Sequence, residues 1–308
     1  MTTAIALFNN KGSVGKTTLT YHLANMVARL GWRVLAVDLD PQANLTSAFF
    51  DEDKLELFWE PESNGTILSS VAPGDLGLSS FEDRLSDAWP RSFLGDEGAI
   101  RVTTAFHRII RGSAVQMKAD VIFLDVGPNL GAINRAALLA SDALVVPLAA
   151  DLFSLQGLRS LGPTLREWRR AWQDIVLPRV PAAVHAPAGT MEPIGYVVLQ
   201  RAVRLDRPVK AYDRWLRRIP GEFHRSVLGE GEPSNLGGGA DPCQLASLRN
   251  YRSLMPLAQD ARKPMFDLRA RDGALGSTGR LVQTCYREFE DLAVRVMEAA
   301  NIPMPVPS

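Results

Sequence analysis

The stretch "NNKGSVGKTT", residues 9 to 18, decides the fold because it places glycines and lysines where a strand gives way to a helix. The apolar run "TAIALF" (3–8) precedes it, and "GKTTLTYHLANMVARLG" (15–31), with apolar residues at helical spacing, follows it. A strand, a glycine turn and a helix start in this order predict a phosphate-binding loop. One lysine is enough for such a loop, so the second needs its own explanation.

The residue types of this loop suit a phosphate chain with a magnesium ion. Backbone N–H groups and the start of the helix attract an anion, and Gly12 and Gly15 let the backbone approach closely. We expect Lys16 to reach the terminal phosphates and the Thr17 hydroxyl to bind magnesium. The predicted nucleotide-binding residues are Lys11, Gly12, Ser13, Val14, Gly15, Lys16, Thr17 and Thr18. The strict form of the pattern has a glycine where this chain has Asn10.

Further apolar runs alternate with helical segments along the chain. The runs are 33–40, 120–128, 143–151 and 194–201, and the helical segments lie at about 130–140 and 155–172. Fully apolar strands that alternate with helices predict a mostly parallel, doubly wound α/β sheet with helices on both faces. Ligands of such sheets bind at the carboxyl ends of the strands, where Asp38, Asp40 and Asp125 fall.

Four motifs in order resemble the ParA/MinD group of P-loop ATPases. "KGSVGKTT" resembles the group's deviant phosphate loop, and "VLAVDLDPQANLTSAF" (34–49) is similar to its switch I. The stretch 121–158 resembles the Walker B strand, switch II and the next strand, and "RKPMFDLRARDGALGS" (262–277) is similar to the segment before the last helix. The resemblance covers most of the chain and implies a P-loop NTPase fold that binds ATP and Mg²⁺.

The resemblance explains the second lysine as a residue that acts in a dimer. In this group the lysine at position 11 reaches the phosphates of the partner subunit, so two nucleotides lie between two chains. Lysines from both sides offset the repulsion between two triphosphates. The alternative from the residues alone is that Lys11 is a solvated loop lysine.

The resemblance also assigns roles to the strand-end carboxylates. It implies that Asp38 and Asp125 hold magnesium through water and that Asp40 positions or polarises the attacking water, so Lys11, Lys16 and Asp40 are the catalytic candidates. The structural alternative is that each aspartate caps a following helix. Ser13 and Ala43 stand where the group has glycine, and Gly127–Pro128 is a variant of its switch II turn. These departures affect the expected turnover, which is slow, more than binding. No NKxD-type guanine motif is present, so ATP is expected, and the base contacts are expected in "LRNYR" (248–252) or after Gln200.

Composition places few limits on the partners. The chain has 308 residues with 34 basic and 34 acidic side chains, so nucleic-acid binding would need a local patch. The helix expected after Pro208 carries Lys210, Arg214, Arg217 and Arg218 on its outer face, and these residues either track DNA phosphates or form a solvated basic face. Two distant cysteines predict neither a disulfide framework nor a zinc site. No signal peptide or long apolar run is present, so we expect a cytoplasmic protein that does not bind membranes, associated with the nucleoid if DNA is bound.

The expected organisation is one ATPase domain, residues 1–308, with irregular insertions near 51–118 and 220–243. The leading hypothesis is a magnesium-dependent ATPase that dimerises with ATP, hydrolyses it slowly to ADP and phosphate, and is stimulated by a ParB-like partner while it partitions DNA or positions a cargo. The alternative is a nucleotide-sensing regulatory subunit of a larger mobile-element, defence or secretion assembly, with little turnover.

Overall fold

The computed structural model describes residues 2–50, 71–72, 77–201, 203–204, 207–208, 214–231, 241–251 and 253–305. Its centre is a seven-stranded parallel sheet in the order β3-β2-β4-β1-β5-β6-β9. The strands of this sheet are β1 (Thr3–Leu7), β2 (Val34–Asp38), β3 (Val71–Ala72), β4 (Val121–Asp125), β5 (Ala143–Ala149), β6 (Glu192–Arg201) and β9 (Gln244–Arg249). The short strands β7 (Val203–Arg204) and β8 (Arg207–Pro208) form a separate antiparallel pair.

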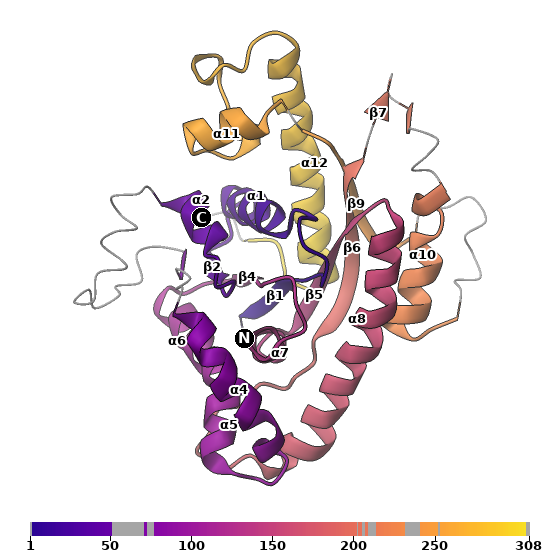
Figure 1. Ribbon diagram of the computed structural model, residues 1–308. Helices are drawn as coiled ribbons and strands as arrows, with labels where there is room; N and C mark the ends of the chain where they lie inside the picture. Colours follow the sequence, from indigo (N-terminus) through magenta and orange to yellow (C-terminus); the bar gives the residue numbers. More distant parts are fainter. Residues whose placement is uncertain are drawn as a thin grey trace.

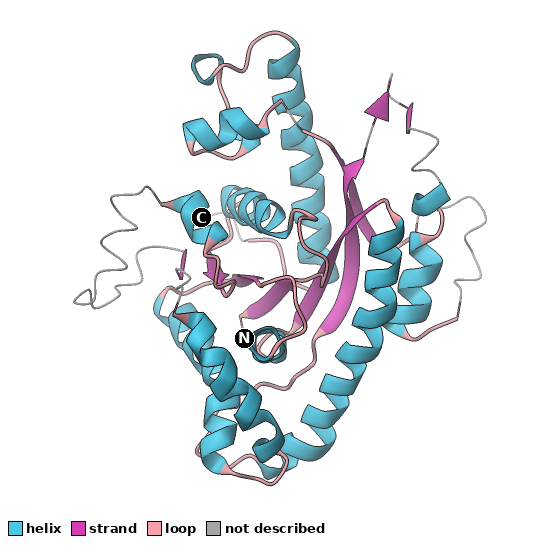
Figure 2. Cartoon of the chain, in the orientation of Figure 1, coloured by secondary structure: helices cyan, strands magenta, loops and turns pink. Residues whose placement is uncertain are grey.

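Helices cover both faces of the sheet, as predicted for a doubly wound fold (Figure 1, Figure 2). One face carries α1 (Lys16–Arg29), α2 (Asn44–Phe49), α11 (Met255–Ala261), α12 (Ser277–Ala299) and the short turns η4 (Met265–Asp267) and η5 (Ala270–Asp272). The other face carries α4 (Leu78–Ser92), α5 (Glu97–Thr103), α6 (Ala105–Gln116), α7 (Ala132–Leu139), α8 (Leu152–Arg170), η1 (Ala171–Val176), η2 (Leu177–Arg179), α10 (Ile219–Glu222) and η3 (Phe223–Leu228).

Alternation along the central strands builds a separate core on each face. In β1, Ala4 and Ala6 pack into one core while Ile5 and Leu7 pack into the other, because successive side chains of a strand point to opposite faces. All four of these residues are fully buried. A strand that is apolar on both faces therefore lies in the middle of the sheet, and β1 occupies that place between β4 and β5.

The stretch 51–118, expected to be irregular, is helical over much of its described part. Residues 78–116 form α4, α5 and α6. The segment "GDEG" (95–98) spans the end of the short break between α4 and α5 and the first residues of α5. Gly95 has φ 77°, and Asp96 caps α5 by accepting a hydrogen bond from the N–H of Ala99 at 3.0 Å. The turn residues of this stretch predict irregular structure, whereas in the structure those at 95–96 separate two consecutive helices.

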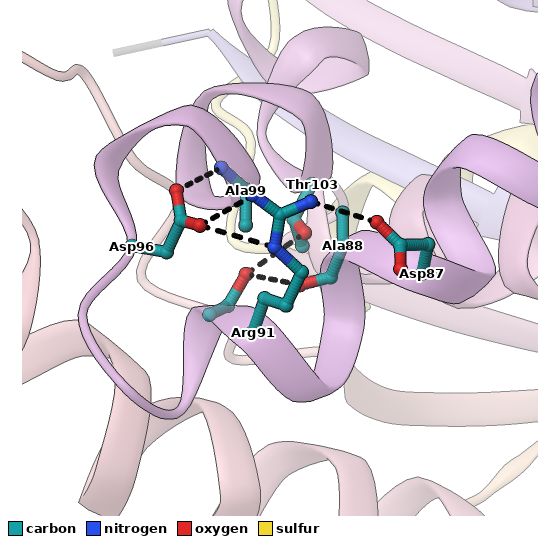
Figure 3. A network of polar contacts seen from close by, with 7 residues as sticks. Asp87, Ala88, Arg91, Asp96, Ala99 and Thr103 are labelled. Carbon is teal, nitrogen blue, oxygen red and sulfur yellow. Dashed lines mark hydrogen bonds and ion pairs between the residues drawn. The ribbon is translucent and has the colours of Figure 1, made fainter.

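A polar network holds the start of α5 to the end of α4 (Figure 3). Arg91 lies between two carboxylates, 2.9 Å from Asp87 and 2.6 Å from Asp96. Beneath it, the buried Ser92 hydroxyl donates to the carbonyl of Ala88 at 2.9 Å and lies 3.1 Å from the Thr103 hydroxyl. The exposed ion pairs add at most about 1 kcal/mol each, so the buried hydroxyl contacts and the apolar face position these helices.

The second expected insertion, 220–243, is also ordered in part. Residues 219–228 are helical, and 232–240 lie outside the described residues. Of the helix expected after Pro208, the described part begins at Arg214 with one helical turn and leads into α10. Among the described helices, none is long and apolar enough to cross a membrane.

Candidate functional site

The loop between β1 and α1 turns at two residues in the left-handed region. Gly15 has φ 90° and is the N-cap of α1, so Lys16 is the first helical residue. Ser13 has φ 58°, a conformation that glycine adopts freely and that costs other residues about 1–2 kcal/mol. Gly12 and Ser13 are exposed while Val14 is buried, so the chain here presents its backbone at the edge of the sheet.

Lys16 is buried at this edge and lies among carboxylates. Its side chain is folded back, with Nζ 3.5 Å from the carbonyl oxygen of Lys11, and only 7% of the residue is exposed. Burial lowers the pKa of Lys16, and the negative charges of Asp125 and Asp40 act in the opposite direction. A buried lysine between two carboxylates carries a desolvation cost that further charged partners can offset.

Asp38 and Asp125 lie side by side because they end two neighbouring strands. The register pairs Asp38 of β2 with Asp125 of β4, and both residues are almost completely buried. Oδ1 of Asp125 is 3.4 Å from the Thr20 hydroxyl, whereas its Oδ2 is buried without a hydrogen-bond partner in the described part of the chain. Burial raises the pKa of Asp125 to about 7, helped by the charges of Asp38 and Asp40 and opposed by the Thr17 hydroxyl and Lys16.

Asp38 and Asp40 are both held by residues that follow β2. Asp38 accepts hydrogen bonds from the N–H and hydroxyl of Thr46, at 2.8 and 2.7 Å, and so also serves the first turn of α2. This contact agrees in part with the structural alternative, in which each aspartate caps the helix that follows it. Asp40 accepts from the N–H of Gln42 at 3.0 Å and is 7% exposed. The N-caps of α2 and α7 are Ala43 and Gly131, so neither Asp40 nor Asp125 caps those helices.

The residues present fit a magnesium ion. A buried carboxylate oxygen without a partner costs free energy unless a cation or its water shell completes its contacts. Asp125 Oδ2 is such an atom, and it lies beside Asp38 and beneath the start of α1, where Thr17 stands. Oxygen ligands of this kind are those that Mg²⁺ prefers. The predicted metal residues Thr17, Asp38 and Asp125 are thus brought together by the fold.

Lys11 is not a freely solvated lysine in the single chain. Its ammonium group forms an ion pair with Asp151, which follows β5 and caps α8 by accepting from the N–H of Ser154 at 2.8 Å. It also lies 5.7 Å from the centre of the Phe153 ring. Phe153 is 70% exposed and Leu152 is 49% exposed, so a charged and apolar surface surrounds this lysine.

A cavity of about 110 Å³ opens beside the loop on the face that carries α1 and α12. Its lining includes Val14 and Gly15 from the loop and Leu199 from the end of β6. The segment expected to contact the base supplies Leu248, Arg249, Asn250 and Tyr251, while Arg252 lies outside the described residues. A mostly apolar slot next to the phosphate loop suits a flat heterocycle.

The predicted DNA-binding residues lie apart from this edge. Arg214, Arg217 and Arg218 are exposed, and Lys210 lies outside the described residues. Two of these arginines flank one aromatic ring, with the guanidinium carbons of Arg214 and Arg218 at 4.3 and 5.4 Å from the ring centre of Trp215. Two arginines of α8 are less available for contact with DNA phosphates, because Arg159 pairs with Glu222 at 2.8 Å and Arg166 donates to the carbonyl of Ser226 at 2.6 Å.

Sequence reasoning missed the residues that support the site. Thr46 holds Asp38, Thr20 lies under Asp125, and Asp151 holds Lys11. Asn134 of α7 donates to the carbonyls of Gly127 and Asn129, at 3.0 and 2.8 Å, and so fixes the turn after β4. Asp151 stands at a strand end like the assigned aspartates, which was a usable signal. The others lie on helices with nothing in the local pattern to mark them.

Comparisons with known proteins agree on this part of the chain. A family model described as an AAA domain matches residues 2–176. The chromosome-partitioning ATPase Soj of Thermus thermophilus is 35% identical over 176 residues, which is 54% of this chain and 62% of that protein. The chain therefore matches less than two thirds of that relative's length.

Solved structures resemble the fold over almost the whole chain. A Corynebacterium diphtheriae protein has a TM-score of 0.69 at 24% identity, covering 96% of this chain and 98% of its own. A Cyanothece McdA variant in complex with ATP has a TM-score of 0.62 at 17% identity and covers 99% of both chains. At these identities the likeness concerns the fold.

Proposed function

Because this chain belongs to the ParA/MinD-type P-loop ATPases of the AAA-domain family, we propose that it binds ATP and Mg²⁺ at the loop after β1 and hydrolyses ATP slowly. The observation that carries the proposal is the meeting of Lys16 with Asp38, Asp40 and Asp125 near one carboxylate oxygen that has no hydrogen-bond partner among the described residues. Bound magnesium would neutralise charge on the phosphate oxygens. We also propose residues 1–308 as one ATPase domain, since both cores pack on one sheet.

Each residue of the loop has a distinct task in this proposal. Residues 12–18 supply backbone N–H groups to the phosphates, and Lys16 leaves the carbonyl of Lys11 to contact the terminal phosphate. Thr17, Asp38 and Asp125 hold the metal or its water. Asp40 is held by the N–H of Gln42 through Oδ1 and positions or polarises the attacking water. The base occupies the cavity between the loop and Tyr251.

We propose that the active form is a homodimer with ATP between the subunits. Lys11 exchanges its ion pair with Asp151 for the phosphates of the partner subunit, and the exposed Leu152 and Phe153 beside it join the contact. Exposed aromatic and apolar side chains that lie together are typical of protein–protein interfaces. The exchange makes association depend on ATP, because without its phosphates Lys11 keeps its own carboxylate.

Measurement of molar mass and hydrolysis tests this dimer. With ATP and Mg²⁺ the wild type is expected to double its mass in light scattering, Lys11→Ala to stay monomeric, and Asp40→Ala to form a dimer that hydrolyses little. Lys118→Asn is the matched control, because Lys118 is an exposed lysine with φ 52°, which asparagine tolerates. A wild type that stays monomeric, together with an Asp40→Ala variant that behaves like it, contradicts the proposal. An ATP-bound dimer without turnover favours the regulatory-subunit alternative.

The partitioning or cargo-positioning role is proposed from the relatives and from the arginines near Trp215. Exposed arginines stacked on an aromatic ring suit sequence-independent contact with nucleic acid. ATP-dependent DNA binding that weakens with salt, and is lost when Arg214, Arg217 and Arg218 are all replaced by alanine, is the expected result. Stimulation of hydrolysis by a ParB-like partner is the second expectation. DNA binding that needs no ATP, or that survives the triple substitution, contradicts this role.

A further inference from the structure

Three different metal-binding side chains meet beside β9, the strand at one edge of the sheet. His224 of η3 and Asp241 and Cys243 before β9 place one ligand atom each within 4.8 Å of one another. Cys243 directly precedes the first residue of β9, so these residues lie at the amino end of that strand. The phosphate loop follows β1, which is three strands away in the order β1-β5-β6-β9, so the two sites lie beside different strands of the sheet.

Two of these residues are buried, so their polar atoms have little access to water and contact one another. His224 is 7% exposed and Asp241 is 5% exposed, although both are polar. Nε2 of His224 lies 3.1 Å from Oδ1 of Asp241. A tetrahedral zinc ion with bonds of about 2.0–2.3 Å holds its ligand atoms roughly 3.3–3.8 Å apart. The nitrogen and the oxygen are already near that separation, and the Cys243 sulfur lies within 4.8 Å of both.

The surrounding contacts are those that orient metal ligands. The other imidazole nitrogen of His224, Nδ1, lies 3.2 Å from a carboxylate oxygen of Glu230. The Tyr196 hydroxyl donates to Oδ2 of Asp241 at 2.8 Å, while Oδ1 faces the histidine and also accepts from the N–H of Cys243 at 3.1 Å. In metal sites the second nitrogen of a ligating histidine commonly donates to a carboxylate, and a ligating carboxylate is itself hydrogen-bonded. Glu230 and Tyr196 occupy both of these supporting positions.

The charge of the cluster matches a divalent cation. Burial, with the nearby charges of Asp241 and Glu230, raises the pKa of the Cys243 thiol to about 11, so the protein by itself keeps this thiol protonated. A bound divalent cation reverses that preference and takes the thiolate. A neutral imidazole, a carboxylate and a thiolate then balance the two positive charges.

We propose that His224 Nε2, Asp241 Oδ1 and Cys243 Sγ bind one zinc ion, with water in a fourth position. Nitrogen, oxygen and sulfur donors together favour zinc over magnesium, which takes oxygen ligands. The ion links η3 to the start of β9 across the 17 positions that separate His224 from Asp241. We call these three residues, with Tyr196 and Glu230, the edge cluster.

Cobalt binding tests the site, because Co²⁺ replaces zinc and a thiolate ligand gives it a charge-transfer band. Metal-free protein, without nucleotide or magnesium, is titrated with Co²⁺. The expected result is one ion per chain and a band that zinc displaces. Cys243→Ser removes the band, whereas Cys285→Ser keeps it, since Cys285 is buried in α12 away from the cluster. The band also persists in Asp125→Asn, which alters the proposed magnesium site.

A second variant keeps the test valid if Cys243→Ser fails to fold. The Glu230 side chain is 63% exposed, so Glu230→Gln is expected to fold and to bind the metal about tenfold more weakly, as loss of a supporting contact does. Absence of a cobalt band in the wild type, or a band that survives Cys243→Ser, overturns the proposal. An unfolding midpoint that is the same with and without Zn²⁺ overturns it as well, because the cluster is then only a hydrogen-bonded network.

Discussion

Two buried polar clusters lie beside different strands of the same sheet, and they differ in how complete they are. In the loop cluster, which comprises Lys16, Asp38, Asp40 and Asp125, one carboxylate oxygen has no hydrogen-bond partner in the part of the chain that the structure describes. In the edge cluster, both oxygens of Asp241 accept hydrogen bonds and both nitrogens of His224 have carboxylate neighbours. An incomplete cluster lowers the stability of the protein while no cation is bound, and it therefore favours cation binding strongly. A complete cluster stabilises the protein with or without a bound cation.

The backbone shows the same contrast. Beside the loop cluster, Ser13 and Ala43 hold left-handed conformations, with φ 58° and 52°, although they carry side chains. Beside the edge cluster, the left-handed position at the end of η3 is filled by Gly229, with φ 75°. Strain that is kept beside the loop cluster, and avoided by a glycine at the end of η3, marks the loop as the part that ligand binding has to order.

The largest effect is expected from removal of the buried loop lysine. Lys16→Ala takes away the cation that faces the terminal phosphate and leaves the surrounding carboxylates uncompensated, so ATP affinity is expected to fall on the order of a thousandfold, about 4 kcal/mol. Isothermal titration with ATP and Mg²⁺ measures this loss, with Lys118→Asn as the control. An affinity within threefold of wild type would mean that the loop cluster does not hold the phosphates.

The buried histidine of α1 is expected to lower the stability of the protein in acid. His22 of α1 donates from Nδ1 to the carbonyl of Thr18 at 2.7 Å and accepts the N–H of Met265 at 3.0 Å, and burial lowers its pKa to about 4. The unfolded chain binds this proton near pH 6.5, so the stabilisation present above that pH is lost as the pH falls towards 4, by about 3 kcal/mol.

Chemical denaturation of the wild type and His22→Gln at pH 7 and pH 4 measures this loss. The difference in unfolding free energy between the two proteins is expected to shift by about 3 kcal/mol in favour of the variant at the lower pH. Other titrating groups, such as His107, are common to both proteins and cancel. A difference that stays constant with pH refutes the assignment to His22.

The same substitution is expected to have opposite effects in the two clusters. Without nucleotide and metal at pH 8, Asp125→Asn removes a buried charge with an unsatisfied oxygen and raises the free energy of unfolding by about 2 kcal/mol. Asp241→Asn replaces an acceptor that faces the Tyr196 hydroxyl and lowers it by about 2 kcal/mol. Denaturation in a chelating buffer measures both. Equal signs would show that the clusters do not differ in completeness.

The smallest effect concerns the backbone. Ser13→Gly and Ala43→Gly relieve a left-handed conformation and are each expected to stabilise the nucleotide-free protein by about 0.5–1 kcal/mol, after the greater flexibility of glycine in the unfolded chain is subtracted. Gly229→Ala is the reciprocal control and is expected to destabilise by about 1 kcal/mol. Thermal unfolding compares the three variants, and a destabilised Ser13→Gly protein would show that the loop is not strained.

The sequence predicted the central sheet and the helices α1, α7 and α8 well, and the helices between β3 and β4 poorly. Apolar runs at 33–40, 120–128 and 143–151 became β2, β4 and β5 because a buried parallel strand leaves a continuous apolar signature. Helices α4 to α6 were missed because they bury a single face and are separated by turns that look like loop. Lys210 lies outside the described residues, so its part in the DNA-binding prediction stays a prediction.

By itself the sequence determined the sheet, the phosphate loop and the set of carboxylates beside it, because each of those residues is marked by the end of an apolar strand next to it in the chain. Only the tertiary structure decided that Asp125 keeps an oxygen without a partner, that Asp151 holds Lys11, and that His224 meets Cys243. These facts depend on contacts between segments that are distant in sequence, and local periodicity carries no information about which distant side chains share a desolvated volume.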